Sequence, residues 1–203
     1  LIGNALDNRL VGGAGNDTLY GGAGLDTAVY KTDRVAHNLS TVTGGFSISG
    51  PEGTDAITGV ERLQFSDKKI ALDLAPSEHA GQALEFIGVL APSAVTAPLI
   101  VGLILGLVDG GLSLHDVFQL AIDVSVVSNI AGSSTNAAVA QMAFRNVIGT
   151  EANAGMTDLL VSFMDGRNAS FSQADFLTVV AGMEINQAHI GLIGLQQMGI
   201  EFI

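Results

Sequence analysis

The sequence predicts an α+β fold, in which a short parallel β-roll with a β-strand cap is followed by an all-α domain of two helical repeats. Three observations predict it. Residues 3–29 form three consecutive nine-residue units rich in glycine, a period typical of a parallel β-helix or roll. Residues 30–74 hold short apolar alternations between turn residues, and the chain beyond Pro76 carries apolar residues at helical spacing. We therefore expect domains at 1–29, 30–74 and 75–203.

The nine-residue units are GNALDNRLV (3–11), GGAGNDTLY (12–20) and GGAGLDTAV (21–29). The last two follow the pattern G-G-x-G-x-D-x-U-x, in which U is a large apolar residue. The glycines allow a tight turn in backbone conformations that a residue with a Cβ avoids. The second half of each unit is expected to be a short strand with its U residue in a thin core. These U residues are Leu10, Leu19 and the smaller Ala28.

The turns of these units are rich in oxygen ligands. Inward carbonyl oxygens and the side chain at the sixth place together suit a hard cation such as Ca²⁺, which takes six to eight oxygens at about 2.3–2.6 Å. Asn8, Asp17 and Asp26 stand nine residues apart, a spacing that a flexible glycine-rich linker would not keep. Successive units are expected on opposite sides of the roll, so one coil takes two units and an ion lies between the turns of units one and three.

Over residues 3–29 the chain resembles the RTX family of hemolysin-type calcium-binding proteins. In that family one turn contributes the carbonyls of its first and third places and its sixth side chain. The turn one coil later contributes the carbonyls of its second and fourth places and its own Asp. The resemblance implies one complete Ca²⁺ site, formed by Gly3, Ala5, Asn8, Gly22, Gly24 and Asp26. It also implies a second site, whose partner turn is missing or degenerate, formed by Asp17 with the carbonyls of Gly12 and Ala14 or of Gly13 and Gly15.

Residues 30–74 are expected to form short strands separated by turns such as 44-GG-45 and 50-GPEG-53. The string 53–67 resembles the segment that closes RTX repeats in many secreted proteins. Its expected role is a cap, because the ends of a solenoid must be covered. The acidic residues of this region would either contribute oxygens to a terminal ion or lie in solvated turns. They are Asp33, Asp55 and Glu61.

Beyond Pro76, two units of about 60 residues repeat. In each, an Asp-Gly pair (109–110 and 165–166) ends one helix, with glycine at C′. The next helix begins with a Ser N-cap, an Asp at N3 and a hydrophobic staple, in 112-LSLHDV-117 and 171-FSQADF-176. The second unit resembles a helical module of unassigned function that often follows RTX repeats in secreted bacterial proteins. This resemblance implies a helical architecture, but it implies no catalytic or binding activity.

The chain has 203 residues and a net charge of −12, from 20 acidic and 8 basic side chains. There is no basic patch, so neither nucleic acid nor an anionic membrane surface is an expected partner. Cysteine is absent, whereas secreted domains of this size often use disulfides, so calcium is expected to stabilise the fold instead. The uncharged stretch 86–108 is long enough to span a bilayer. Pro92 and Pro98 interrupt it, and we predict a buried core helix and no transmembrane span.

The sequence contains no catalytic constellation. The histidines form no H-E-x-x-H pair, no G-x-S-x-G elbow is present, and the glycines of the repeats are not followed by the helix that a dinucleotide fingerprint needs. We therefore predict a protein that is not an enzyme. The four histidines are His37, His79, His115 and His189.

The RTX resemblance implies export by a bacterial type I secretion system, with 199-GIEFI-203 as the end of an uncleaved C-terminal signal. Our leading hypothesis is the C-terminal, calcium-binding module of a larger secreted or surface-associated bacterial protein. It would fold on meeting extracellular Ca²⁺ and attach or self-associate through its helical part. The expected partners are Ca²⁺, the secretion machinery and either cell-surface polysaccharide or a second copy. One alternative is the tail of a secreted protease, lipase or polysaccharide-modifying enzyme. Another is a helical part that binds carbohydrate or another small ligand in a groove with several polar side chains.

Overall fold

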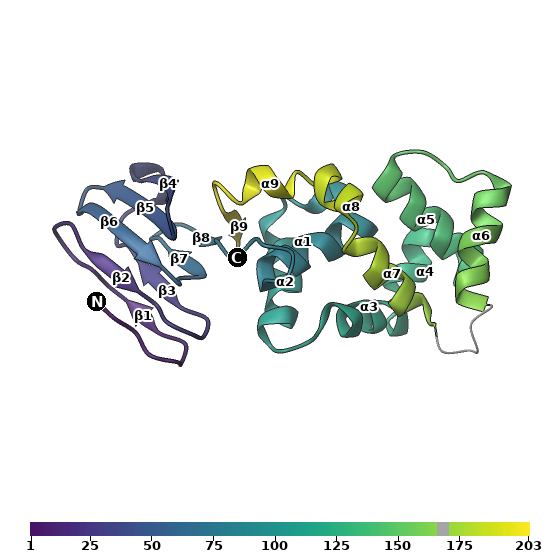
Figure 1. Cartoon of the computed structure of the whole chain (residues 1–203), viewed down its shortest axis with the longest axis horizontal. Helices are drawn as coiled ribbons and strands as arrows, with labels where there is room; N and C mark the ends of the chain where they lie inside the picture. Colours follow the sequence, from purple (N-terminus) through teal and green to yellow (C-terminus); the bar gives the residue numbers. More distant parts are fainter. Residues whose placement is uncertain (166–170) are drawn as a thin grey trace.

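A computed structural model describes residues 1–165 and 171–203 of the chain (Figure 1). The fold is mixed, with two β-sheets and a set of helices among the described residues. Figure 1 shows an elongated molecule with the sheets at one end and the helices at the other. The N-terminus lies at the far edge of the sheets, and the C-terminus lies where the two parts meet.

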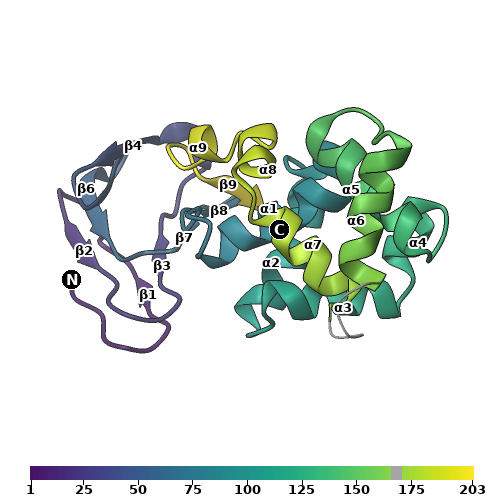
Figure 2. The ribbon, with the colours of Figure 1, turned by 45° about the vertical axis from the view of Figure 1, so that its right-hand side comes forward.

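The strands belong to two separate sheets, of order β1-β3-β7-β8-β9 and β2-β6-β5-β4. Figure 2 shows these sheets as two layers that face each other. The strands are β1 Arg9–Leu10, β2 Thr18–Tyr20, β3 Thr27–Val29, β4 Asn38–Val42, β5 Gly45–Gly50, β6 Gly53–Thr58, β7 Arg62–Gln64, β8 Lys69–Ala71 and β9 Ile200–Phe202.

Parallel pairing joins strands that come from alternate units. In the first sheet β1 pairs with β3, with Leu10 opposite Ala28, and β3 pairs in turn with β7, with Ala28 opposite Leu63. In the second sheet β2 pairs in parallel with β6, with Leu19 opposite Ile57. The strand of the second unit therefore lies in a different sheet from the strands of the first and third units.

The U residues of the three units are buried between the sheets. Leu10, Leu19 and Ala28 are 8%, 1% and 0% exposed, which confirms their predicted core positions. The small Ala28 leaves room for larger neighbours from both sheets in the same cluster. These neighbours are Tyr30, Ile48, Ile57, Val60, Leu63, Phe65, Ile70 and Leu72.

The end of the chain returns to the first sheet as strand β9. Strand β9 pairs antiparallel with β8, and Lys68 and Glu201 form an ion pair beside this junction. The sequence assigned 75–203 to a helical domain and gave its last residues no place in a sheet. A Cβ on Gly102 would lie 2.3 Å from the carbonyl oxygen of Ile203, so a helix packs directly on this terminal strand.

In the described residues the helices form two successive groups of four, followed by one short helix. The first group is α1 His79–Leu90, α2 Pro98–Asp109, α3 Leu114–Asp123 and α4 Val126–Ala131, and the second is α5 Asn136–Ile148, α6 Ala154–Asp165, α7 Gln173–Ala181 and α8 Glu184–His189. Helix α9 spans Leu192–Leu195, and short 3₁₀ turns occupy Arg34–Ala36 and Pro92–Ala94.

The capping motifs predicted for these helices are present, with one shift. Ser113 with Asp116 and Ser172 with Asp175 form complete capping boxes at the starts of α3 and α7. After α2 the C′ place, predicted for Gly110, is taken by Gly111, which has the left-handed conformation, because the helix continues one residue further. The corresponding Gly166 lies outside the described residues.

The uncharged stretch 86–108 is split between α1 and α2, most of whose apolar side chains face the helical core. Within the described part of the chain, no single helix has both the length and the apolar character needed to cross a membrane. Helices α2 and α3 meet these criteria only when counted together, and they are bent by 117° at their junction.

A charged cluster connects the first sheet to the helices. The Arg62 guanidinium, on β7, is buried and forms ion pairs with Asp73 and with Asp109, the latter at 2.7 Å between Nη2 and Oδ1. Asp109 is the last residue of α2, and His79 Nδ1, in α1, lies 2.9 Å from its Oδ1. Burial raises the pKa of Asp73, and the adjacent Arg62 opposes that shift. Because Arg62 is buried with two acidic partners, removing it would leave an uncompensated charge inside the fold.

A second buried acid joins α1 to α8. Glu85 is 2% exposed, and Gln187 Nε2 donates a hydrogen bond to its Oε1 at 2.7 Å. Burial raises the pKa of Glu85 to about 7, although the hydrogen bond from Gln187 acts in the opposite direction. Glu85 is therefore mostly protonated in the folded protein at pH 6, whereas in the unfolded chain it is ionised.

We predict that Glu85→Gln makes the helical part more stable at pH 8. The folded protein binds more protons than the unfolded chain between about pH 4.5 and 7, so the free energy of unfolding decreases as pH rises through this range. The loss should approach about 3 kcal/mol above pH 7, at about 1.4 kcal/mol per unit of pKa. Urea unfolding at saturating Ca²⁺ between pH 4 and 8 measures it. The exposed Glu184→Gln is the control, and parallel curves for Glu85→Gln and wild type would contradict the prediction.

Candidate metal centre

The turns that precede the parallel strands form two stacks. Turns 3–8, 21–26 and 59–61 lie one above another because the strands that follow them are neighbours in the first sheet. Turn 12–17 is stacked in a similar way, through the pairing of β2 with β6, on residues 50–55, which comprise the β5–β6 hairpin turn and the start of β6 and are called turn 50–55 below. The structure thus brings together the first and third units, as the predicted complete site requires.

Glycine is needed where one turn rests on the next. A Cβ on Gly22 would lie 2.4 Å from the carbonyl oxygen of Asn4, and one on Gly24 would lie 3.0 Å from that of Leu6. Both glycines have φ near +115°, which side chains rarely allow. The stacking therefore brings backbone oxygens of one turn against the backbone of the next, and no side chain fills the space between them.

The side chains at the sixth place link each turn to the one before it. Asp26 Oδ1 accepts a hydrogen bond from the Asn8 backbone N–H at 2.7 Å. One coil later, Glu61 Oε2 accepts from the Asp26 N–H at 2.8 Å. In the other stack Asp55 Oδ1 accepts from the Asp17 N–H at 2.9 Å. Asp55 and Glu61 therefore take the positions that correspond to Asp17 and Asp26 in the turns beneath them, whereas the exposed Asp33 accepts a hydrogen bond from Ser66 outside both stacks.

Two carboxylate oxygens in these stacks are buried without a hydrogen-bond partner among the described residues. They are Asp17 Oδ2 and Asp26 Oδ2. An unpaired buried oxygen of a charged group is costly, since it has lost its water and gained nothing in return. Asn8 differs, because its Oδ1 accepts from the Asn4 N–H at 2.6 Å within its own turn. The amide of the first unit thus satisfies its oxygen internally, and the two aspartates do not.

The donor set of both stacks consists of carboxylates and carbonyls, which suit Ca²⁺ better than a transition metal. In the described part of the chain, no group of three or more His, Cys, Asp or Glu side chains is placed to hold a metal ion. A site here must therefore take most of its ligands from backbone carbonyls. The carbonyls predicted for this role belong to Gly3, Ala5, Gly12, Ala14, Gly22 and Gly24, and their role as ligands remains a prediction.

The structure supplies the partner turn that the sequence predicted to be missing or degenerate, and it is a degenerate one. Turn 50–55 lies against turn 12–17, with Gly15 N–H donating to the Glu52 carbonyl at 2.7 Å and Thr54 N–H donating to Asn16 Oδ1 at 2.9 Å. The signal was present in 50-GPEGTDAIT-58, which has the glycines, Asp and apolar residue of a nonapeptide at places one, four, six and eight. The hairpin of β4 and β5 separates this segment from the third unit, so the segment does not continue the nine-residue period.

Comparison with known proteins agrees with the first part of this description. The family model of the RTX calcium-binding nonapeptide repeat (4 copies) matches residues 2–29. No curated protein and no solved structure matches the chain. RTX repeats indicate calcium binding in a secreted bacterial protein, so this chain carries calcium-binding repeats of a kind found in exported proteins.

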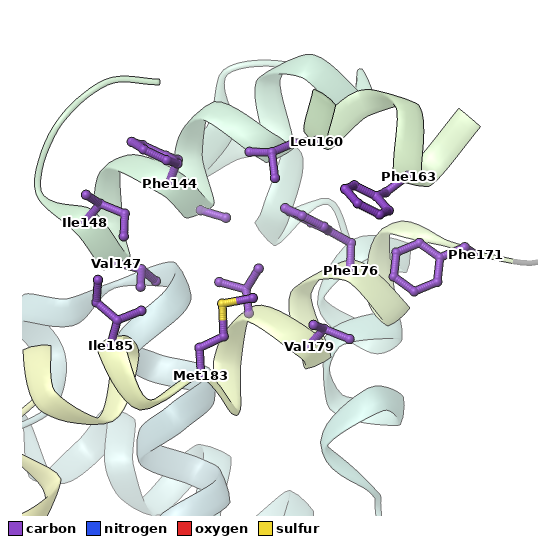
Figure 3. Close-up of a pocket in the computed structure, with 12 residues that line it drawn as sticks. Phe144, Val147, Ile148, Leu160, Phe163, Phe171, Phe176, Val179, Met183 and Ile185 are labelled. Atoms are coloured by element: carbon purple, nitrogen blue, oxygen red, sulfur yellow. The ribbon is translucent and has the colours of Figure 1, made fainter. Parts of the chain in front are cut away.

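Two apolar grooves lie in the helical part, one in each group of four helices. The groove between α5, α6, α7 and α8 has a volume of about 430 Å³ (Figure 3), and that between α1, α2, α3 and α4 about 410 Å³. Three pairs of partly exposed side chains stand at the same places of the two groups: Leu120 and Val179, Val124 and Met183, Val126 and Ile185. The described lining of both grooves is apolar, so it lacks the hydrogen-bonding groups that a carbohydrate needs.

We predict that Asp26→Asn changes stability in opposite directions with and without Ca²⁺. The variant removes a buried negative charge, so in EGTA a smaller fraction of its repeats should be unfolded than in wild type at the same temperature. In Ca²⁺ it should unfold at a lower temperature, with an affinity for the ion reduced at least ten-fold, which corresponds to about 1.4 kcal/mol. Thermal unfolding by circular dichroism and calorimetric titration measure both effects.

The matched control for this prediction is Asp158→Asn, which changes an exposed acid of α6. Asp17→Asn should behave like Asp26→Asn, because the same oxygen is unpartnered in both residues. A variant that is shifted in one direction under both conditions would show that the unpaired oxygens are not ion ligands.

Proposed function

We propose that this chain is a non-catalytic, calcium-binding module of a secreted or surface-associated bacterial protein, and that Ca²⁺ is the switch that folds its repeats. The observation that carries this proposal is the pair of buried, unpartnered oxygens of Asp17 and Asp26 in stacked glycine turns. The two sheets would be the two walls of a β-roll, with ions held at the turns along its edges.

The energetics of the repeats support a folding switch. Ordering a residue costs about 1–2 kcal/mol of backbone entropy, and glycine costs more than most. Strands of two or three residues and a thin core offer little apolar burial in return. A cation that binds only the folded state stabilises it by RT ln(1 + [L]/Kd), about 1.4 kcal/mol per site at ten times Kd. Extracellular calcium modules have dissociation constants of about 10⁻⁴–10⁻³ M, so the ion would contribute outside the cell and not in the cytosol.

Export by a type I system is consistent with this switch. A chain whose repeats stay unfolded at cytosolic calcium would be threaded outward and would then fold on arrival. Each additional site raises the stability gained at the destination. The absence of cysteine is compatible with such a protein, because the ions take the stabilising role that disulfides have in other secreted domains.

We predict that removal of Ca²⁺ unfolds the repeats and leaves most of the helical signal. In EGTA, far-UV circular dichroism should lose its β component, and the amides of β1, β2 and β3 should exchange with deuterium at the rate of an unfolded chain. Millimolar Ca²⁺ should restore protection, whereas the same concentration of Mg²⁺ should not, since Mg²⁺ is smaller and loses its water reluctantly. Identical exchange in EGTA and Ca²⁺ would refute the switch.

The helical part is the proposed site of attachment, through contact with a second copy. Among the residues that the structure describes, the lining of the two grooves carries no charged side chain, so two copies would bring the grooves together without placing their acidic side chains against each other. An exposed side chain does not need to be apolar for the monomer to fold. Leu120 and Val179 are nevertheless apolar, although they are 38% and 53% exposed at equivalent places of the two groups. A role in association explains why both groups of helices keep them.

We predict that Leu120→Asp and Val179→Asp abolish self-association without unfolding the chain. The wild type should increase in mass with concentration up to about 100 µM in light scattering coupled to size exclusion, whereas the variants should remain monomeric. Ile193→Asp is the control, because Ile193 is 73% exposed on α9 and lies outside both grooves. A wild type that is monomeric at every concentration would rule out this mode of attachment.

A further inference from the structure

The last turn of the first stack is shorter than the turns beneath it. Strand β7 pairs with β3 so that Arg62 stands opposite Thr27, which makes Glu61 the counterpart of Asp26. Turn 21–26 takes six residues to reach this place, whereas the cap reaches it in three, at 59–61. The cap turn has therefore lost most of its carbonyls and carries a longer acidic side chain in their place.

Asp26 is the buried acid beneath this short turn. It is 0% exposed, its Oδ1 accepts from Asn8, and its Oδ2 has no partner among the described residues. The point that a Cβ on Gly21 would occupy lies 2.5 Å from Asp26 Oδ2 and 1.7 Å from the Gly59 carbonyl oxygen. The two oxygens are therefore no further apart than the sum of these distances, a separation that two ligands of one cation can have.

Glu61 adds a second carboxylate next to Asp26. Its Oε2 accepts from the Asp26 N–H, which holds the side chain against turn 21–26. The neighbouring cation is not available to neutralise the pair, because the Arg62 guanidinium is bound to Asp73 and Asp109. In the part of the chain that the structure describes, neither Asp26 nor Glu61 has an ion pair with a basic side chain.

We propose that a Ca²⁺ ion binds between turn 21–26 and the cap turn, held by Asp26 Oδ2, the Gly59 carbonyl and the Glu61 carboxylate. This inference rests on the proposed calcium-binding function but adds a site that the nonapeptide pattern does not contain. Glu61 and Gly59 lie outside the residues that match the RTX repeat, and the cap turn is not a nonapeptide turn. The longer Glu side chain reaches the ion where the truncated backbone cannot.

This terminal ion would also connect the repeats to the rest of the fold. The Asp26 carbonyl accepts hydrogen bonds from the N–H groups of both Glu61 and Arg62, at 3.2 and 2.9 Å. Arg62 is the residue that joins the sheet to α2 through Asp109. An ion at Asp26 and Glu61 would thus fix the junction between the calcium-dependent turns and the helical part.

The test is the number of Ca²⁺ ions bound by the full chain at saturation, measured by equilibrium dialysis, with affinities from calorimetry. Glu61→Gln keeps the acceptor for the Asp26 N–H and removes the charge. It should bind one ion fewer per chain than wild type, with the remaining affinities changed by less than about two-fold. Asp33→Asn is the matched control, an exposed acid of the same region that should keep the wild-type number.

Each outcome decides a different point. If Glu61→Gln binds as many ions as wild type with unchanged affinity, the terminal site is wrong while the proposed calcium-binding function stands. If wild type binds no Ca²⁺, the proposed function fails together with this site. If Glu61→Gln does not fold, Glu61→Asp decides the question, because it keeps the charge but withdraws it by one methylene. It should also lose one ion, and an unchanged number would overturn the inference.

Discussion

The hydrogen bond from the backbone N–H of one turn to the acid of the next is the interaction on which the repeats depend. It orients the carboxylates of Asp26, Asp55 and Glu61 along the stacks and uses one oxygen of each. In Asp26 the other oxygen is left buried and unpaired. Such an arrangement is unfavourable without a cation and favourable with one, because the ion neutralises the charge and replaces the lost water. This arrangement requires glycine at the first place of the turn, because a Cβ on Gly3 or Gly21 would occupy the space beside the side chain at the sixth place.

The same physical logic distinguishes the first unit from the others. In turn 3–8 the sixth residue is Asn8, which carries no charge and accepts from Asn4 within the turn. This turn satisfies itself by hydrogen bonds, as an Asx-type turn does, and needs an ion less than the turns with aspartate. Within the site that the family pattern marks as complete, the Asn8 turn therefore has less electrostatic need for calcium than the Asp26 turn. The need is greatest at Asp17 and Asp26, whose partner turns both lie in the cap.

The local pattern of the chain predicted the features that local physics decides. The nonapeptide spacing placed Leu10, Leu19 and Ala28 in the core, and the Ser and Asp spacing placed both capping boxes. The local pattern did not predict pairings between distant segments. A nonapeptide turn at 50–55 was hidden because a hairpin is inserted before it, and β9 pairs with a strand about 130 residues earlier. These two pairings join segments that are distant in the sequence, so no local periodicity predicts them. Glu61 was among the candidates, but only the register of β7 on β3 shows that it takes the place of an aspartate.

Different interactions stabilise the two ends of the molecule. This difference indicates which part of the chain depends on calcium for its folding. The helices share a large apolar core that includes Ala71 and Ile200 from the first sheet. Strands β7, β8 and β9 are thus supported by α2 and by the Arg62 cluster without any ion. Within the described residues, strands β1 and β3 are supported by each other, by β7 and by the thin core between the sheets. Loss of calcium should therefore separate β3 from β7. At the turns these strands are linked by the hydrogen bond from Asp26 N–H to Glu61 Oε2 and by those from the Glu61 and Arg62 N–H groups to the Asp26 carbonyl. The residue pair that would hold the last ion is also the pair at which the ordered part of the chain would end.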